Sequence, residues 1–76
     1  PRIQEIREEA VQDLNLRIHK ILKNTPMEES DRVNLLNAVD TAAGKVVNKL
    51  IFGLRDSLEQ DIFLECVAGL EKLYEE

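Results

Sequence analysis

The sequence has 76 residues with a net charge of -5, three glycines, two prolines, three aromatic residues and a single cysteine, Cys66. So short a chain forms one small all-α domain that buries less of its surface than a larger domain, and its acidity disfavours nucleic acid and anionic membranes as partners. The lone cysteine excludes an internal disulfide, and no apolar run is long enough to span a membrane. A single cysteine and the lack of a signal-peptide pattern predict a cytoplasmic protein. The lack of an initiator methionine predicts that the chain is a fragment of a larger protein.

The first predicted element is a helix over residues 2–24, because apolar residues recur there at spacings of three and four and so share one face. Arg7 and Arg17 lie on or beside this face, where an arginine stem covers apolar surface while its charged end reaches water or a carboxylate. His19 projects from the polar side, where an ordinary surface imidazole is a better interpretation than a metal ligand. The apolar face comprises Ile3, Ile6, Ala10, Val11, Leu14, Ile18, Ile21 and Leu22.

A second helix is predicted over residues 26–55, with Thr25 as its N-cap, Pro26 at its first position and Glu28 completing a capping box. Its apolar band covers nearly half of the circumference, which is more than one neighbouring helix can cover. Phe52 lies on the opposite face, as an isolated exposed aromatic residue or a contact with another chain. The band comprises Val33, Leu36, Val39, Ala42, Ala43, Val46, Val47, Leu50, Ile51 and Leu54.

Ser57, with Gln60 three residues later, predicts the start of a third and shorter helix over residues 58–74. Two long helices joined by a short connection, followed by this shorter one, make a helical hairpin with an added arm. Cys66 lies inside the apolar stripe with no histidine near it in sequence, so a packed thiol is a better interpretation than a nucleophile. The stripe comprises Ile62, Phe63, Cys66, Val67, Leu70, Leu73 and Tyr74.

The sequence contains no pattern that indicates catalysis, a cofactor or a metal. Its carboxylates are spread along polar helix faces instead of being paired in a site that excludes water. Glycine-rich phosphate loops and basic runs with interleaved aromatic residues are absent. Arg17, Lys20 and Lys23 cluster late in the first helix, where basic side chains complement the helix dipole, an interpretation that we prefer to an anion site. We therefore expect no catalytic, cofactor-binding or metal-binding residue in this segment.

Three stretches resemble the C-terminal dimerisation domain of glutamyl-tRNA reductases. Residues 46–55, VVNKLIFGLR, resemble a stretch that in this family usually reads VNKLLHxP and leads shortly to LR. Residues 6–10, IREEA, are similar to the IRxxA stretch of the family's long linking helix, and residues 63–74 are similar to its closing helix, where YLxALxxLF is common. Phe52 stands where the family usually has histidine, and Gly53 where proline often follows.

The resemblance implies a parent enzyme that reduces the glutamyl group carried on its tRNA to glutamate-1-semialdehyde with NADPH, the first committed step of tetrapyrrole (porphyrin) biosynthesis by this route. In the family the catalytic cysteine and the NADPH site lie in the N-terminal domains, and the tRNA is bound mainly through domains other than this one. Cys66 would therefore not be the nucleophile. Residues 1–76 would form a single homodimerisation domain, whose helices from two subunits pack into one bundle around a two-fold axis.

The wide apolar band of the second helix supplies a physical reason for a dimer, because exposed apolar surface costs about 25 cal/mol per square ångström. Two alternatives stay open at this point. One is a stand-alone helical adaptor that binds an unrelated partner helix, and the other is a tRNA-contacting arm built on the basic cluster of the first helix. The predicted dimer interface comprises Leu36, Val39, Ala43, Val46, Val47, Leu50, Ile51 and Leu54.

Overall fold

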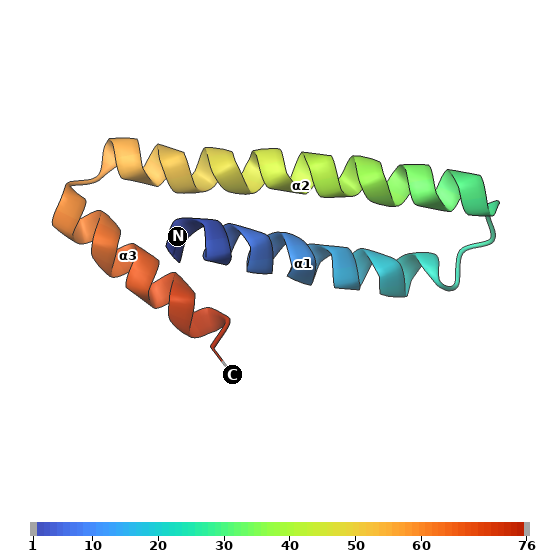
Figure 1. Ribbon diagram of the computed structural model, residues 1–76, viewed down its shortest axis with the longest axis horizontal. Coiled ribbons are helices and arrows are strands. Elements are labelled where there is room, and N and C mark those ends of the chain that lie inside the picture. Colours follow the sequence, from blue (N-terminus) through green and yellow to red (C-terminus); the bar gives the residue numbers. More distant parts are fainter. Residues whose placement is uncertain (1, 76) are drawn as a thin grey trace.

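The computed structural model describes residues 2–75, and no strand occurs among them. Helix α1 (Arg2–Leu22), helix α2 (Glu29–Ser57) and the shorter helix α3 (Gln60–Leu73) follow one another along the chain. Helices α1 and α2 lie antiparallel, and α3 turns back from the end of α2 so that the start of α1 lies between α2 and α3 (Figure 1). The predicted fold, an all-α hairpin of two long helices with a shorter third helix, is confirmed.

The helix ends differ from the predicted ones at both connections. Helix α1 ends at Leu22, and α2 begins three residues later than predicted, so the interpretation of Thr25 as an N-cap is wrong. The Thr25 hydroxyl instead donates to the Ile21 carbonyl, 3.1 Å away, which also accepts from the Asn24 backbone N–H in the turn that ends α1. Ser57 belongs to the last turn of α2, and an extended Glu59 precedes α3, so the second predicted N-cap is also wrong.

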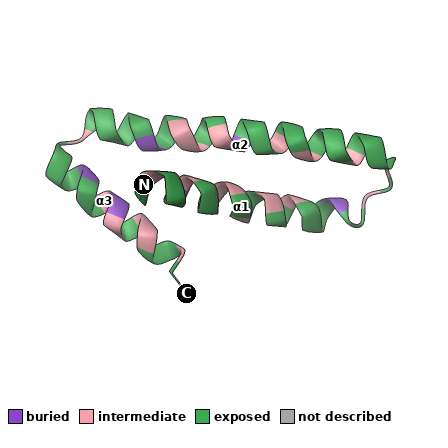
Figure 2. Ribbon diagram, viewed as in Figure 1, coloured by how far each residue is buried: buried purple, intermediate pink, exposed green. Residues whose placement is uncertain are grey.

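The hydrophobic core lies at one end of the hairpin, where α3 meets it (Figure 2). Four side chains from all three helices form a cluster there, each no more than 6% exposed. The cluster comprises Ile6, Ile51, Phe63 and Val67. Arg2 of α1 and Glu71 of α3 form an ion pair near this cluster. The pair raises the pKa of Arg2, mainly through the hydrogen bond to Glu71 and also through the negative charge of that carboxylate. Helix α3 is therefore attached mainly to the beginning of α1 and the end of α2.

The part of the hairpin beyond this cluster, residues 10–22 and 29–45, consists of two helices side by side. We call it the distal hairpin. Within residues 2–75 it contributes two further buried side chains, Leu22 and Ala43. Stable domains bury their apolar faces between at least two layers of secondary structure, and two adjacent helices form only one. The radius of gyration, 15.1 Å, also exceeds the roughly 11 Å of a compact chain of this length.

Candidate interaction surface

Two polar contacts join α1 to α2 and fix how the helices are aligned. Arg7 Nη1 donates to Asn48 Oδ1 at 3.1 Å, and Asn15 Nδ2 donates to Asp40 Oδ1 at 2.6 Å. The four residues of these contacts line one cleft, which places both contacts on the same side of the antiparallel pair. Arg7 is half-buried, as its position beside the apolar face predicts.

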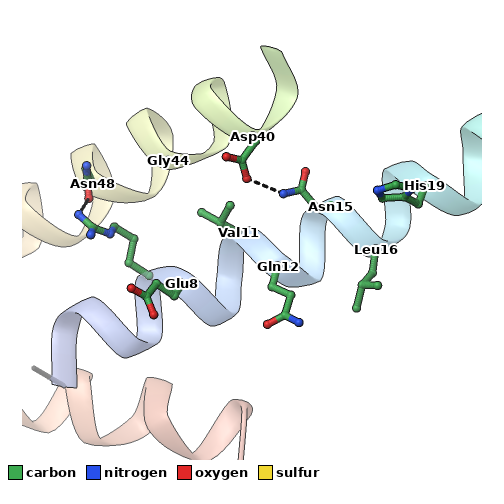
Figure 3. Close-up of a pocket in the computed structure, with 10 residues that line it drawn as sticks. Glu8, Val11, Gln12, Asn15, Leu16, His19, Asp40, Gly44 and Asn48 are labelled. Atoms are coloured by element: carbon green, nitrogen blue, oxygen red, sulfur yellow. Dashed lines mark hydrogen bonds between the residues drawn. The ribbon is translucent and has the colours of Figure 1, made fainter. Parts of the chain in front are cut away.

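A cleft of about 500 Å³ lies between α1 and α2 on the side where these contacts are made (Figure 3). Its lining combines polar side chains of α1, among them Glu8, Gln12 and His19, with apolar surface that includes Val11 and Leu16. Gly44 of α2 also lines the cleft. Apart from its own helix, no described atom lies within 4 Å of the position that a Cβ on Gly44 would take, so the space beside this glycine is open. We call this side of the hairpin the cleft side. It contains polar groups from both helices, and its single histidine is exposed.

The predicted basic cluster of α1 is only partly brought together. Lys20 and Lys23 line a recess of about 460 Å³ with His19 and Arg32, whereas Arg17 pairs with Asp13 at 3.0 Å and does not line it. These cations lie at the C-terminal end of α1, whose free carbonyls carry partial negative charge. The dipole interpretation of the basic residues of α1 stays a prediction.

Arg32 of α2 is the most constrained of these basic side chains. Its guanidinium donates to the Leu22 carbonyl at 2.6 Å and to the Thr25 carbonyl at 3.2 Å. Its Nε lies 3.7 Å from a Glu29 carboxylate oxygen. Arg32 thus supplies charged donors to two carbonyls at the end of α1 and in the turn that follows it, a role that the sequence pattern did not predict.

No group of three or more His, Cys, Asp or Glu side chains within residues 2–75 is arranged to hold a metal ion. Cys66 is a half-buried thiol on α3. Of the helices described, none combines the length and the apolar character that crossing a membrane would require.

The eight predicted interface residues fall into three groups by exposure. Packing within the chain already buries Ala43 and Ile51. Leu36, Val39 and Val47 are half-buried, and Val47 packs against the core cluster. The remaining three are exposed: Val46 by 58%, Leu50 by 62% and Leu54 by 41%. Five of the eight residues thus pack at least partly within the fold of one chain, and the three exposed residues are accessible to a partner.

The chain exposes more surface than its size requires. Its accessible area is 6020 Å², whereas a monomeric globular protein of 8.7 kDa exposes about 4,700 Å². The excess of about 1,300 Å² is larger than the roughly 800 Å² that each partner contributes to a protein–protein interface of standard size. Large hydrophobic side chains account for part of it, since twelve of them in the described chain are at least 36% exposed.

Several of these exposed residues were not predicted to lie in an interface. Leu14 and Ile21 of α1 and Ile62 and Leu73 of α3 belong to the apolar stripes expected to pack within the chain, yet all four are exposed. Leu35 of α2 lies outside the predicted band and is 40% exposed. Helical periodicity identifies an apolar stripe, but it does not say how much of that stripe a neighbouring helix covers.

Comparison with known proteins found no family model, no curated protein and no solved structure that matches this chain.

Proposed function

We propose that this chain is a homodimerisation module through which two copies of a larger protein associate. The observation that carries the proposal is the exposure of Val46 and Leu50 in the second half of the longest helix. Their neighbours Ala43 and Ile51 already pack within the chain, so the exposed pair continues an apolar surface beyond the core. Removing such surface from water stabilises an assembly by about 25 cal/mol per square ångström. A two-fold dimer covers this patch with the same patch of the other copy.

For the parent protein we propose an NADPH-dependent glutamyl-tRNA reductase of tetrapyrrole biosynthesis, acting in the cytoplasm. This part of the proposal rests on the resemblance of residues 6–10, 46–55 and 63–74. One feature of the fold supports it, because residues from all three stretches are in contact. Arg7 bonds to Asn48, and Ile6, Ile51 and Phe63 share the buried cluster. In this proposal other domains bind NADPH and most of the tRNA, and they carry out the reduction.

Sedimentation equilibrium on the 76-residue chain, over a wide range of concentration, tests the homodimer directly. We expect a dimer for the wild-type chain and a folded monomer for Leu50→Glu, because the substitution would bury an unpaired charge in the interface. Leu50 is a better position than Val47 for this test. Val47 packs against the core cluster, so a charge there would destabilise the monomer as well.

Phe52→Glu is the matched control on α2. Phe52 is exposed, follows Leu50 by two residues and so lies about 200° around the helix from it. The guanidinium carbon of Arg55 lies 4.7 Å from the centre of its ring, and a glutamate would meet the same cation. We expect this variant to remain dimeric. A wild-type chain that is a stable, folded monomer at all concentrations would contradict the homodimer and favour the adaptor that binds an unrelated helix.

A further inference from the structure

We infer that two copies of the chain pack their α2 helices antiparallel along a ridge of exposed apolar residues, so that the acidic end of each copy lies toward a basic segment of the other. The inference rests on the homodimer proposed above and specifies the orientation of its two-fold axis. The ridge comprises Ala38, Ala42, Val46, Leu50 and Leu54.

The ridge follows from a spacing of four residues along α2. Side chains four residues apart lie on neighbouring turns of a helix, and rows of this kind form the ridges through which helices most often pack. Both alanines of the ridge are exposed, and Val46, Leu50 and Leu54 are exposed by 58%, 62% and 41%. Leu58, the next member of the row, packs against the core cluster and ends the exposed part. One helix thus presents an apolar row that its own chain leaves uncovered.

The side chains of the ridge increase in size along α2, from alanine at its beginning to leucine at its end. An antiparallel pair centred between Val46 and Leu50 places Ala42 of each copy opposite Leu54 of the other. Large side chains then meet small ones, which keeps the spacing of the two helices even. A parallel pair would place Leu54 opposite Leu54 and Ala42 opposite Ala42, and contact at the leucines would leave a gap at the alanines. The taper of the ridge therefore favours the antiparallel orientation.

The charge distribution favours the same orientation. Residues 59–76, which we call the acidic arm, contain six acidic residues and one basic residue, whereas residues 1–58 contain nine of each. The net charge of -5 thus belongs to the part of the chain that follows α2. A parallel pair would bring two acidic arms to the same end of the dimer, where like charges repel, and an antiparallel pair separates them.

The antiparallel orientation also gives each acidic arm a basic counterpart. Residues 14–27 contain three basic residues and no acidic one. Helices α1 and α2 are antiparallel, with Asn15 beside Asp40, so this segment runs beside the first half of α2 (Figure 1). In an antiparallel pair the end of the partner's α2, from which its acidic arm follows, lies along that same half. The three basic residues are Arg17, Lys20 and Lys23.

The occupant of the ridge is a second copy of the chain, because the ridge complements itself in size and the two ends of the chain complement each other in charge. A two-fold contact satisfies both at once, since every contact made by one copy is repeated by the other. The accessible area agrees with this occupant. The excess of about 1,300 Å² over a monomer of this mass is enough for one partner's share of a standard interface.

Disulfide formation between engineered cysteines distinguishes the two orientations. Every variant carries Cys66→Ala, so that the engineered cysteine is its single thiol. Ala42→Cys and Leu54→Cys are oxidised separately and after mixing under reducing conditions, and a non-reducing gel shows the products. We expect cross-linked dimers in the mixture and none in either variant alone. In an antiparallel pair the two Ala42 positions are about 18 Å apart along the helices, and a disulfide joins Cα atoms at most about 7 Å apart.

Thr41→Cys, mixed with Leu54→Cys, is the matched control for this experiment. Thr41 is exposed and precedes Ala42 on α2, but it does not belong to the ridge. We expect no cross-linked dimer in this mixture. Circular dichroism checks that each variant is folded.

Glu65→Lys on the exposed surface of the acidic arm provides a second test, because the two orientations predict opposite signs. In an antiparallel dimer the substitution removes attraction to the basic segment of the partner, so the dissociation constant rises by about threefold at low salt. In a parallel dimer it relieves repulsion between the two arms, and the constant falls. Sedimentation equilibrium is run at about 0.01 M salt, where the Debye length is about 30 Å, and at about 1 M, where screening abolishes the difference.

The outcomes separate this inference from the homodimer itself. Cross-linking of Ala42→Cys or Leu54→Cys alone, or a tighter dimer for Glu65→Lys, would overturn the antiparallel orientation and leave the homodimer intact. A dimer in which neither the single variants nor the mixture cross-link would place the contact away from the ridge, and the inference would be wrong. A monomeric wild-type chain overturns the proposed homodimer, and this inference with it.

Discussion

The two ends of the helical hairpin are stabilised by different kinds of contact. Where α3 covers it, Ile6, Ile51, Phe63 and Val67 exclude water almost completely. In the distal hairpin, the Asn15–Asp40 hydrogen bond and the carbonyl contacts of Arg32 align two helices that bury little apolar surface between them. The comparison shows what a third helix contributes, because apolar stripes become a core only where a second layer covers them.

This difference bears on association as well as on stability. An apolar side chain that is exposed in the distal hairpin, such as Leu14 or Ile21, has no third helix of its own chain above it. A partner chain that packed there would cover the apolar side chains of the distal hairpin, as α3 covers those at the other end. The substitutions below probe each end separately, and each has a control that leaves the contact in question intact.

The largest effect is expected from Phe63→Ala in the core cluster. Truncating a buried phenylalanine removes its transfer free energy and leaves a cavity, which together cost about 3–5 kcal/mol of unfolding free energy. Phe63 is 5% exposed and contacts residues of all three helices through the cluster. The measurement is urea denaturation at a protein concentration where the wild-type and variant chains have the same association state.

Leu64→Ala is the control for that prediction, because Leu64 is the next residue and is 50% exposed. We expect the free energy of unfolding to fall by less than about 1 kcal/mol. Equal losses in the two variants would mean that α3 is not anchored through Phe63, and the contrast between the two ends of the hairpin would not hold.

The sequence predicts the three helices and the stripes on them because helical periodicity is a local property. It places Phe63 and Ile62 in the same stripe, yet the structure buries one and exposes the other, since the outcome depends on where α1 lies relative to α3. The Arg7–Asn48 contact joins positions 41 residues apart, and no local pattern identifies such a pair. Five of the eight predicted interface residues are buried or half-buried within the chain for the same reason.

The helix caps show a different limit of sequence analysis. Thr25 and Pro26 have the residue types of a helix start, but the Thr25 hydroxyl has a competing acceptor in the carbonyl of Ile21. Side chains such as threonine bond to whichever backbone group is free nearby, at the end of one helix or at the start of the next. A short connection brings both within reach, so the capping pattern does not decide between them.

An intermediate effect is expected from Arg32→Ala, which removes two hydrogen bonds from a charged donor to the end of α1. We expect a loss of about 1–2 kcal/mol in unfolding free energy, because two hydrogen bonds from a charged donor are lost and the Leu22 carbonyl keeps only the Thr25 backbone N–H as a donor among the described residues. Faster amide hydrogen exchange at Lys23 and Thr25, whose backbone N–H groups bond within this turn, would locate the effect at the distal hairpin.

Arg17→Ala is the control for Arg32, since it removes an arginine of α1 whose side chain is 72% exposed and paired only with Asp13 among the described residues. An exposed ion pair between residues four apart on a helix contributes at most about 0.5 kcal/mol. If Arg17→Ala destabilised the chain as much as Arg32→Ala, the contribution of Arg32 would be its general charge and not its contacts with the two carbonyls.

The smallest effect, and the only gain in stability, is expected from Gly44→Ala. Gly44 lies inside α2 without a positive φ, and apart from its own helix no described atom lies within 4 Å of the position of the new Cβ. Alanine should therefore raise the unfolding free energy by about 0.5–1 kcal/mol through its higher helix propensity. Because Gly44 lines the cleft side, the dimer dissociation constant should not change. A gain in stability accompanied by weaker association would instead place the partner in the cleft, where the glycine leaves room for it.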